Sequence, residues 1–450
     1  MGDKTLYLFF SLLMMDIKIF TENIEEDAKQ LLYDFGKTPE TKDMKVRIMP
    51  DVHLGEGIVI GFTAKMGEYV KPQWIGVDIG CCVSAMFFLN RLPENKYEEF
   101  EKRVRAKIPT GMDLQDETQF NVKDFIKRCN IELHKHHMEP AFLYDDELVD
   151  WCKKRRIDYK VFCHSIGTLG GGNHFMEYDE GMSSSDAIFG GCGGDMMTPI
   201  NAFICHTGSR NIGLKVEKYW ENIADNQKVG KEIQKKIIKE VREKYPDQKE
   251  RWGDLIHESI GEYKKTVHPG FLYGENLDGY LKDMVIAQFY SRVNHETIHH
   301  LVAKIYKDLT GSDEQIYPEV FTVHNYIDFD DWVIRKGAIR ADKDMPFLLP
   351  LNMATGTALC VGLGNEDWNC SCSHGAGRKM SRRKSKETLS VEEFRGEMNG
   401  IYSTTVGPST LDESPMAYKD PNEILGLIEP TAKVCNLIKP RINIKDAKTL

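Results

Sequence analysis

Between residues 46 and 89, short runs of β-branched and aromatic residues alternate with glycine-rich joints. The runs read VRIM, QWIGVDI and VSAMFFL. Runs of this length bounded by glycine are typical of strands stacked in a sheet, and they differ from the longer periodic pattern of a helical bundle. This part of the chain therefore predicts a set of strands.

Other segments have the helical spacing of polar and apolar residues. Residues 22–36 open with acidic residues and close at a glycine, which are helix start and stop signals. We expect further helices over Tyr97–Lys107 and Val122–His137. Long amphipathic helices should follow residue 210 and continue through about Lys265, and another helix should cover about Asp278–Leu309.

A glycine-rich block, residues 165–194, leads into an expected strand, NAFICHTGSR, at 201–210. The last third of the chain returns to strands and turns, in EVFTVHNYIDF (319–329) and LCVGLGNEDWNCSCSHGAGR (359–378). We find no internal repeat, no low-complexity tract and no linker. The pattern therefore gives no reason to divide the chain into separate domains.

The first residues are a separate case. The apolar run Leu6–Met15 is too short to span a bilayer and lacks a small-residue cleavage site. A weak signal sequence and a start at Met14 or Met15 explain this run equally well. We treat residues 1–14 as an uninformative N-terminal extension.

Composition narrows the class of protein. Hydrophobic residues make up 41% and charged residues 28% of the chain, as in globular proteins that are not disordered. The net charge of -10 argues against wholesale coating of nucleic acid but leaves local basic pockets open. Eleven cysteines, an odd number scattered over 450 residues, favour a reducing compartment, and we expect the cytoplasm.

Five residues that could bind a metal each lie beside glycines or at an expected strand end: Asp78, Cys81, His174, His206 and His324. Taken singly, each is most simply a hydrogen-bonded core residue. Together they offer a carboxylate, a thiolate and three imidazoles, which suits manganese, iron, cobalt or zinc better than magnesium or calcium. Bound cations would also neutralise the charges of Asp78 and Cys81 in their apolar run.

A second histidine motif competes with this set. Residues 295–299 read HETIH, the pattern in which two imidazoles bind zinc and a glutamate acts as base. The surrounding helix carries apolar residues through the same face and offers no third ligand at a metzincin spacing. An ordinary polar helix stripe is the better interpretation, and HKHH at 134–137 is similarly best explained as a solvated helix face.

The motif HGAGR at 374–378 has the composition of a phosphate-binding turn. Glycine amides with Arg378 and Arg382 form a natural cradle for phosphate, although a basic surface turn would look the same. His374 in such a cradle could attack a phosphorus atom, because imidazole is substantially unprotonated at pH 7. The common nucleotide-binding loops are absent from the sequence.

In this order, the motifs closely resemble the RtcB family of GTP-dependent RNA ligases, from about Met15 to Asp446. The matching stretches are MPDVHLG (49–55), GVDIGC (76–81), GTLGGGNHFME (167–177), HTGSRNIG (206–213), HNY (324–326), RKGAIRA (335–341), HGAGRKMSR (374–382), DESPMAYKD (412–420) and the terminal KPRINIK.

The resemblance implies a role for each candidate residue. The family's two-metal centre falls on Asp78, Cys81, His174, His206 and His324, with Cys81 as the bridging thiolate. His374 matches the nucleophile that takes GMP from GTP, and Asp51 a position tied to catalysis. The positions that hold the guanylate fall on Asn173, Glu177, Ala376, Tyr418 and Lys445, and those that contact phosphate or RNA on Arg210, Arg378 and Arg382.

The sequence departs from the family in three places. Cys82 stands where the family usually has glycine. LPLNM (349–353) replaces the usual Pro-Gly-Ser-Met, and INIKDAK lacks the glycine expected after Lys445. These departures indicate a divergent member.

From the pattern and the resemblance we expect one α/β (α+β) domain over residues 15–450, with a large, mostly antiparallel β core flanked by helices. The implied activity joins RNA 3′-phosphate or 2′,3′-cyclic phosphate ends to 5′-hydroxyl ends, using GTP and two Mn²⁺ ions, in RNA repair or tRNA splicing. We expect a monomer without a membrane partner, and an activating protein partner remains open.

Two other functions remain open from the sequence. One is a zinc-dependent hydrolase centred on His295, Glu296 and His299. The other is an RNA-end binding protein that retains the metals but has lost nucleotidyl transfer through the LPLNM change.

Overall fold

The largest sheet of the computed structural model has seven strands in the order β11-β12-β14-β5-β6-β4-β7. Every neighbouring pair in it is antiparallel. The model describes residues 15–184, 197–226, 231–266 and 268–446. The strands are β4 (Cys82–Phe88), β5 (Phe175–Ser184), β6 (Met197–Thr207), β7 (Gln315–Val323), β11 (Pro346–Asn352), β12 (Gly356–Gly362) and β14 (Ala432–Ile444).

A second sheet has five strands in the order β1-β2-β3-β9-β8, and a small third sheet pairs β10 with β13. Only β1 and β2 run parallel among the paired strands of the described residues. The strands are β1 (Ile17–Ile19), β2 (Val46–His53), β3 (Ile60–Lys65), β8 (Asn325–Ile327), β9 (Val333–Lys336), β10 (Ala338–Arg340) and β13 (Ser371–Ser373).

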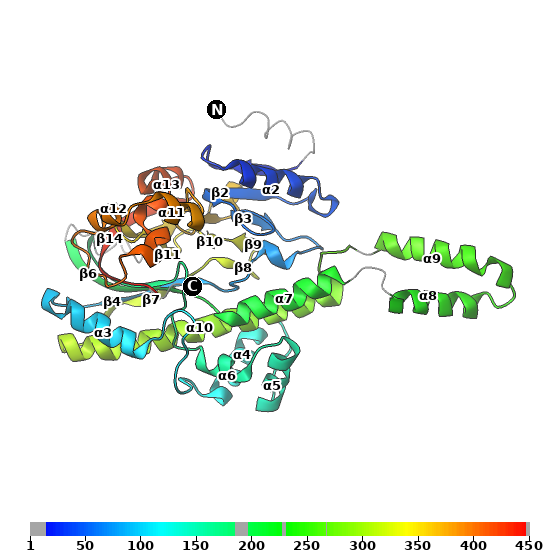
Figure 1. Cartoon of the computed structure of the whole chain (residues 1–450), viewed down its shortest axis with the longest axis horizontal. Helices are drawn as coiled ribbons and strands as arrows, with labels where there is room; N and C mark the ends of the chain where they lie inside the picture. The colour runs from blue at the N-terminus through cyan, green and yellow to red at the C-terminus, as the bar shows by residue number, and fades with distance from the viewer. Residues whose placement is uncertain (1–14, 185–196, 227–230, 267, 447–450) are drawn as a thin grey trace.

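Helices flank these sheets, so the predicted α+β class with a mostly antiparallel core is confirmed (Figure 1). The helices are α2 (Glu26–Gly36), α3 (Tyr97–Lys107), α4 (Val122–Lys135), α5 (Asp145–Lys154), α6 (Tyr159–His164), α7 (Asn211–Asp225), α8 (Lys231–Lys244), α9 (Trp252–Thr266), α10 (Gly274–Thr310), α11 (Arg382–Thr388), α12 (Val391–Glu397) and α13 (Pro421–Leu427).

The long helix α10 runs beside α7 and underneath the seven-stranded sheet (Figure 1). Its 37 residues include buried apolar side chains around most of its circumference, because it packs against helices on one side and strands on the other. Charged residues interrupt that apolar surface. In the described part of the chain, no helix combines the length and the apolar character needed to cross a membrane.

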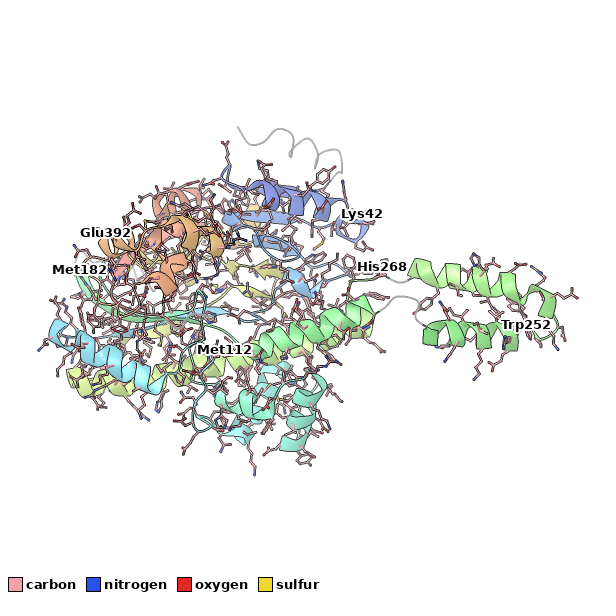
Figure 2. The ribbon with its side chains drawn as sticks, in the orientation of Figure 1. Lys42, Met112, Met182, Trp252, His268 and Glu392 are labelled. Atoms are coloured by element: carbon pink, nitrogen blue, oxygen red, sulfur yellow. The ribbon has the colours of Figure 1, made fainter. Side chains whose placement is uncertain are left out.

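Helices α8 and α9 form an arm that extends away from the rest of the molecule (Figure 1). Trp252, at the start of α9, lies near the far end of this arm (Figure 2), and the guanidinium of Arg242 stands 5.3 Å from its ring centroid. The two helices therefore pack mainly against each other.

Several predicted elements need correction. QWIGVDI is not a strand: Pro72–Trp74 forms a 3-10 turn, and the rest is a turn in which Gly76 and Gly80 have positive φ angles of 95° and 73°. The sequence interpretation missed β3, and it missed β5 within the glycine-rich block. Residues 1–14 of the expected extension lie outside the described residues, as do 185–196 of that block.

Candidate metal centre and adjoining cavity

Four neighbouring strands bring the five predicted metal ligands to one edge of the large sheet. His174 precedes β5 and His206 lies near the end of β6, where Phe175 pairs with His206. Cys81 precedes β4 and His324 follows β7. Because neighbouring strands are antiparallel, the starts of β5 and β4 meet the ends of β6 and β7 at the same edge.

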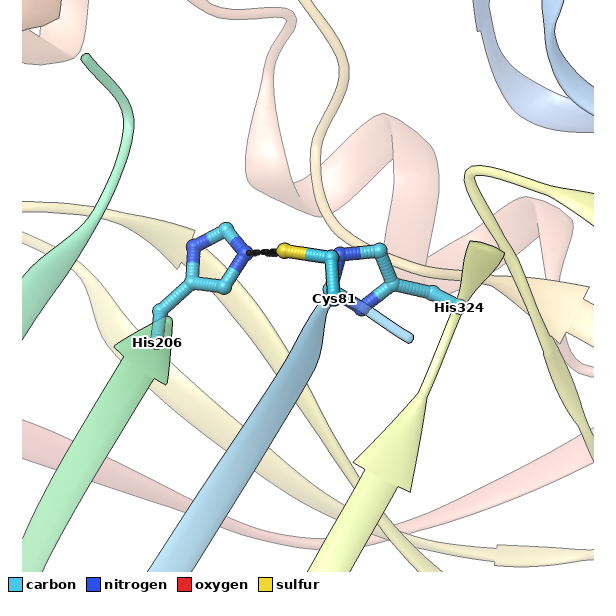
Figure 3. Close-up of side chains that lie close together, drawn as sticks. All are labelled: Cys81, His206 and His324. Carbon is cyan, nitrogen blue, oxygen red and sulfur yellow. Dashed lines mark hydrogen bonds between the residues drawn. The ribbon is translucent and has the colours of Figure 1, made fainter. Parts of the chain in front are cut away.

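The ligand atoms lie close together. The Cys81 thiol is 3.2 Å from Nε2 of His206 and 3.6 Å from Nε2 of His174. Nε2 of His206 lies 3.3 Å from Nε2 of His324, and Nε2 of His174 lies 3.0 Å from the Asp78 carboxylate. Cys81 stands between the two imidazoles of His206 and His324 (Figure 3).

These atoms form two groups that could each hold a cation. One is Cys81, His206 and His324, and the other is Asp78, Cys81 and His174. Cys81 belongs to both groups, which agrees with the bridging thiolate that the resemblance implies. The structure therefore brings together all five predicted ligands.

The electrostatics of the cluster fit bound cations. Burial, together with the nearby Asp78 carboxylate, raises the pKa of the Cys81 thiol well above its ordinary value. Burial and the neighbouring imidazoles hold the pKa of both His206 and His324 well below the ordinary value, so their nitrogens keep their lone pairs. One oxygen of Asp78 is buried without a hydrogen-bond partner. A cation would satisfy that oxygen and stabilise the thiolate.

The backbone around the cluster is shaped so that the Asp78 carboxylate and the His174 ring can reach the other ligand atoms. A Cβ atom on Gly208 would lie 2.2 Å from the Asp78 carboxylate, so only glycine lets Asp78 reach the cluster. Nδ1 of His174 donates to the carbonyl oxygen of Leu169 at 3.1 Å. That bond places the proton on Nδ1 and leaves Nε2 facing the cluster.

His374 and Asp51 form a second pair next to this centre. Nδ1 of His374 lies 2.7 Å from the Asp51 carboxylate, which also accepts the His374 backbone N–H at 3.1 Å. Burial raises the pKa of Asp51, but the His374 charge and hydrogen bond outweigh it and keep the pKa below its ordinary value. The ionised carboxylate holds a proton on Nδ1 and leaves Nε2 with its lone pair.

The pair is held close to the metal centre. The ring centroids of His374 and His324 are 5.1 Å apart. A Cβ on Gly377 would stand 2.2 Å from the Asp51 carbonyl oxygen, and the φ angle of Gly377 is 72°. The HGAGR turn therefore needs glycine there to press against β2.

A cavity of about 780 Å³ opens beside His374 and His206. Seven of the eight residues that the resemblance assigns to guanylate and to phosphate or RNA contacts line it, and Arg210 is the exception: Asn173, Glu177, Ala376, Arg378, Arg382, Tyr418 and Lys445. The volume suits a nucleotide-sized ligand.

Glu413 is a site residue that the sequence interpretation did not single out. Its buried carboxylate contacts Lys445 at 3.0 Å, Arg378 at 3.3 Å and also Arg382, and it accepts the Tyr418 hydroxyl at 2.9 Å. Burial raises the pKa of Glu413, but the three cations outweigh it and lower the pKa to about 2. Glu413 therefore orders the basic wall of the cavity. Its only signal in the sequence is its place in the DESPMAYKD motif.

Arg210 lies outside the cavity lining. Its guanidinium donates to the Thr168 hydroxyl at 3.0 Å and to the Gly111 carbonyl at 2.8 Å. It lies near Asp78, whose negative charge opposes the lowering of the Arg210 pKa by burial. In this structure Arg210 supports the loop that leads to His174.

The family departures can also be located. Cys82 faces away from the metal centre, into a separate cavity of about 350 Å³ that His295 and Phe321 also line. Asn352 of LPLNM lines the large cavity, but its side-chain oxygen accepts the backbone N–H groups of Ala354 and Thr355 at 3.0 and 2.8 Å. That oxygen is therefore occupied by the turn between β11 and β12.

The HETIH residues do not form a zinc site. The His295 ring lies 2.6 Å from the Ser84 hydroxyl and 3.1 Å from the Thr207 carbonyl, and His299 lies 2.7 Å from the same hydroxyl. Glu296 pairs with Arg128 at 2.6 Å. Among the described residues, neither group that could hold a metal includes these histidines.

The fold and the site together define a single-domain α+β enzyme with a candidate thiolate–imidazole metal centre beside a basic cavity. A family model described as "tRNA-splicing ligase RtcB" matches residues 37–446, and the chain belongs to this RtcB family.

Relatives named as RtcB ligases align with this chain over most of their own length. The "RNA-splicing ligase RtcB" of Escherichia coli (strain K12) is 27% identical over 95% of this chain and 97% of its own. The "tRNA-splicing ligase RtcB" of Aeropyrum pernix is 24% identical over 84% of this chain and 82% of its own. The "RNA-splicing ligase RtcB" of Mycobacterium bovis is 23% identical over 84% of this chain and 90% of its own.

Glu177 predicts a dependence of stability on pH. Burial raises its pKa to about 8, against the lowering by the Asn443 hydrogen bond and the Lys445 charge. The folded protein therefore keeps its proton where the unfolded chain has lost it, and the associated stability disappears as pH rises toward 8. Relative to Glu177→Gln, the free energy of unfolding should fall as pH rises from 6 to 8. Urea unfolding at both pH values measures this, and equal slopes for the two proteins would contradict it.

Proposed function

We propose that this protein is an RNA ligase that joins a 3′-phosphate or 2′,3′-cyclic phosphate end to a 5′-hydroxyl end, using GTP and Mn²⁺ through a histidine–GMP intermediate. The observation that carries the proposal is the His374–Asp51 pair, 2.7 Å apart, on the wall of a nucleotide-sized cavity beside the metal centre. Membership in the RtcB family and the printed names of its relatives support the same reaction.

In the first step, Nε2 of His374 attacks the α-phosphorus of GTP. An N–P bond forms, the bond from that phosphorus to the bridging oxygen breaks, and pyrophosphate leaves. Asp51 keeps the other ring proton on Nδ1 and stabilises the positive charge that develops on the ring. Asp78, Cys81, His174, His206 and His324 would hold two Mn²⁺ ions, which when bound lower the charge on the phosphates and on the leaving oxygens.

The second and third steps use RNA. An oxygen of the RNA 3′-phosphate attacks the phosphorus of the histidine-bound GMP, the N–P bond breaks, and His374 returns to its free state. The 5′-hydroxyl of the other RNA then attacks the 3′-phosphorus, forms the new diester, loses its proton and releases GMP. A cyclic end is first opened by hydrolysis.

The cavity walls supply the contacts for the nucleotide. Asn173, Glu177 and Lys445 line the cavity, with the Lys445 ammonium 3.5 Å from the Asn173 carbonyl. The segment around Ala376 and the guanidiniums of Arg378 and Arg382 also line it, and backbone amides and guanidiniums are the donors used in anion cradles.

The mouth of the cavity has two lips of opposite charge. The basic lip consists of Lys379 and Lys384, which are exposed and form no ion pair within the described residues. The acidic lip, Glu25, Glu26 and Asp27, lies at the start of α2. A single RNA strand needs only such a local basic contact, so the net charge of -10 is compatible with RNA binding.

We propose that the enzyme acts as a monomer. We further propose that the enzyme acts in the cytoplasm, in RNA repair or tRNA splicing, with RNA ends and GTP as its partners. Whether it also requires an activating protein can be decided by assaying the isolated chain.

The first test is covalent labelling. Incubation with α-labelled GTP and Mn²⁺ should give an acid-labile protein adduct, and His374→Ala should abolish it because no other nucleophile occupies that place. The matched control is Glu296→Gln, the base of the alternative hydrolase, which should label like wild type. Absence of label on the wild-type protein would favour an RNA-end binding protein instead, and peptidase activity lost in Glu296→Gln would favour the hydrolase.

Asp51→Asn should slow adduct formation by about 100-fold or more. The asparagine oxygen can still accept both N–H groups of His374, which share one oxygen of Asp51, but it lacks the negative charge that stabilises the positive charge developing on the ring. Single-turnover rates with labelled GTP measure the effect. A rate within twofold of wild type would show that the Asp51 charge does not assist the attack.

The basic lip predicts a defect confined to RNA. Lys379→Ala with Lys384→Ala should raise the KM for RNA by about 10-fold and reduce the salt dependence of binding, because two phosphate contacts are lost. Labelling with GTP should be unchanged, since no RNA takes part in it. The control is Lys102→Ala with Lys107→Ala on α3. Equal KM values in the two double variants would contradict the role of the lip.

A further inference from the structure

Asn294 lies in the middle of α10 and is fully buried. Its side-chain oxygen accepts the backbone N–H groups of Gly167 at 2.8 Å and Thr168 at 3.2 Å. Its amide donates to the Thr168 carbonyl at 3.1 Å, to the Thr207 hydroxyl at 3.3 Å and to the Gly208 carbonyl at 3.3 Å. One side chain thus ties two chain segments to a helix.

Both segments carry metal-ligand candidates. Gly167 and Thr168 belong to the loop that ends at His174, and Thr207 follows His206 directly. The Thr207 hydroxyl donates to the Leu169 carbonyl at 2.6 Å, and Nδ1 of His174 donates to that same carbonyl at 3.1 Å. The Thr207 hydroxyl therefore connects the Asn294 amide to the Leu169 carbonyl, which is the carbonyl that orients the His174 ring.

The next residue on α10 extends the contacts to the other two strands. Nε2 of His295 donates to the Thr207 carbonyl at 3.1 Å, so its Nδ1 accepts the Ser84 hydroxyl at 2.6 Å. Ser84 lies on β4, three residues after Cys81. The Ser84 oxygen also lies 2.7 Å from His299, whose other nitrogen is 3.2 Å from the carboxylate of Glu319 on β7, the strand that leads to His324.

We propose that Asn294 and His295 act as a positioning clamp for the metal centre, holding the ends of β4, β6 and β7 and the His174 loop in register. An asparagine in a helix interior is less favourable than alanine, and its burial requires partners. Here all its partners lie on segments that carry metal ligands. The HETIH motif thus begins with a structural role behind a metal centre rather than with a zinc site of its own.

The clamp is a positioning role, because neither residue touches the cations or the substrates. It rests on the proposed use of metal by the five ligands. Hydrogen bonds that orient metal ligands usually contribute 10–100-fold in metal affinity. Loosening the clamp should therefore weaken metal binding while the fold remains.

The experiment measures binding of Co²⁺ to the whole protein in the absence of GTP and RNA. The thiolate-to-cobalt absorption band reports occupancy of the Cys81 centre, and competition with Mn²⁺ gives its affinity. Asn294→Asp and Thr207→Val should each weaken the affinity by about 10–100-fold. Thr207→Ser restores the hydroxyl and should return the affinity to within threefold of wild type.

The matched control is Ser291→Ala. Ser291 lies one turn earlier on α10, is equally buried, and its hydroxyl has no hydrogen-bond partner in the described residues. It should bind cobalt like wild type. Thermal unfolding without metal separates folding from affinity, and if Asn294→Asp fails to fold, the Thr207→Val and Thr207→Ser pair decides.

The outcomes separate the two proposals. If the wild-type protein shows no cobalt band, the metal use in the proposed function fails. If wild type binds cobalt and Thr207→Val binds it equally tightly, the clamp is wrong while the proposed function stands. If Ser291→Ala weakens binding as much as Thr207→Val, any change on α10 acts alike and the specific clamp is wrong.

Discussion

The structure depends on one constraint, which is that a partly buried carboxylate, a buried thiol and three buried imidazoles lie within a few ångströms of one another at one edge of an antiparallel sheet. Burial without cations opposes the ionised thiol, and it depresses the pKa of both His206 and His324. Placing such groups together is unfavourable unless something neutralises them. Because β5, β6, β4 and β7 alternate in direction, the starts of β5 and β4 lie at the same edge as the ends of β6 and β7, and the ligand candidates there come together.

The cavity lies at the same edge of the sheet. Glu177 lies on β5, which begins directly after one of the candidate metal ligands, and Lys445 follows β14, the strand that pairs with β5, so the cavity wall and the candidate metal centre share one sheet. Glu413 balances three cations of that wall and prevents their mutual repulsion. An anionic ligand can then exchange for part of this pairing without exposing a buried, unpaired carboxylate.

The sequence predicted this site better than it predicted the surrounding elements. Motifs beside glycines singled out the five candidate metal ligands and His374, and the structure places these six residues close together. QWIGVDI misled because an apolar run buried as a turn has the same composition as a short strand. The sequence interpretation did not single out Glu413 and Asn294, because their contacts are with residues distant in the sequence. The hydrogen bond between Asn294 and Gly167 is an example. The periodicity of a helix does not predict such contacts.

The distance between the candidate metal centre and His374 is set by backbone pairing. The Ala338 N–H donates to the His324 carbonyl at 3.2 Å, and β10, which begins at Ala338, pairs with β13, which ends one residue before His374. The Asn325 side-chain amide donates to the Asp78 carbonyl at 3.2 Å, and its oxygen accepts the Gly337 N–H at 2.8 Å. These two bonds connect the turn that carries Asp78 to the residue just before β10. Because backbone pairing holds His374 beside His324, the two side chains are oriented without a ligand, and in the proposed reaction binding energy need not be used to assemble them.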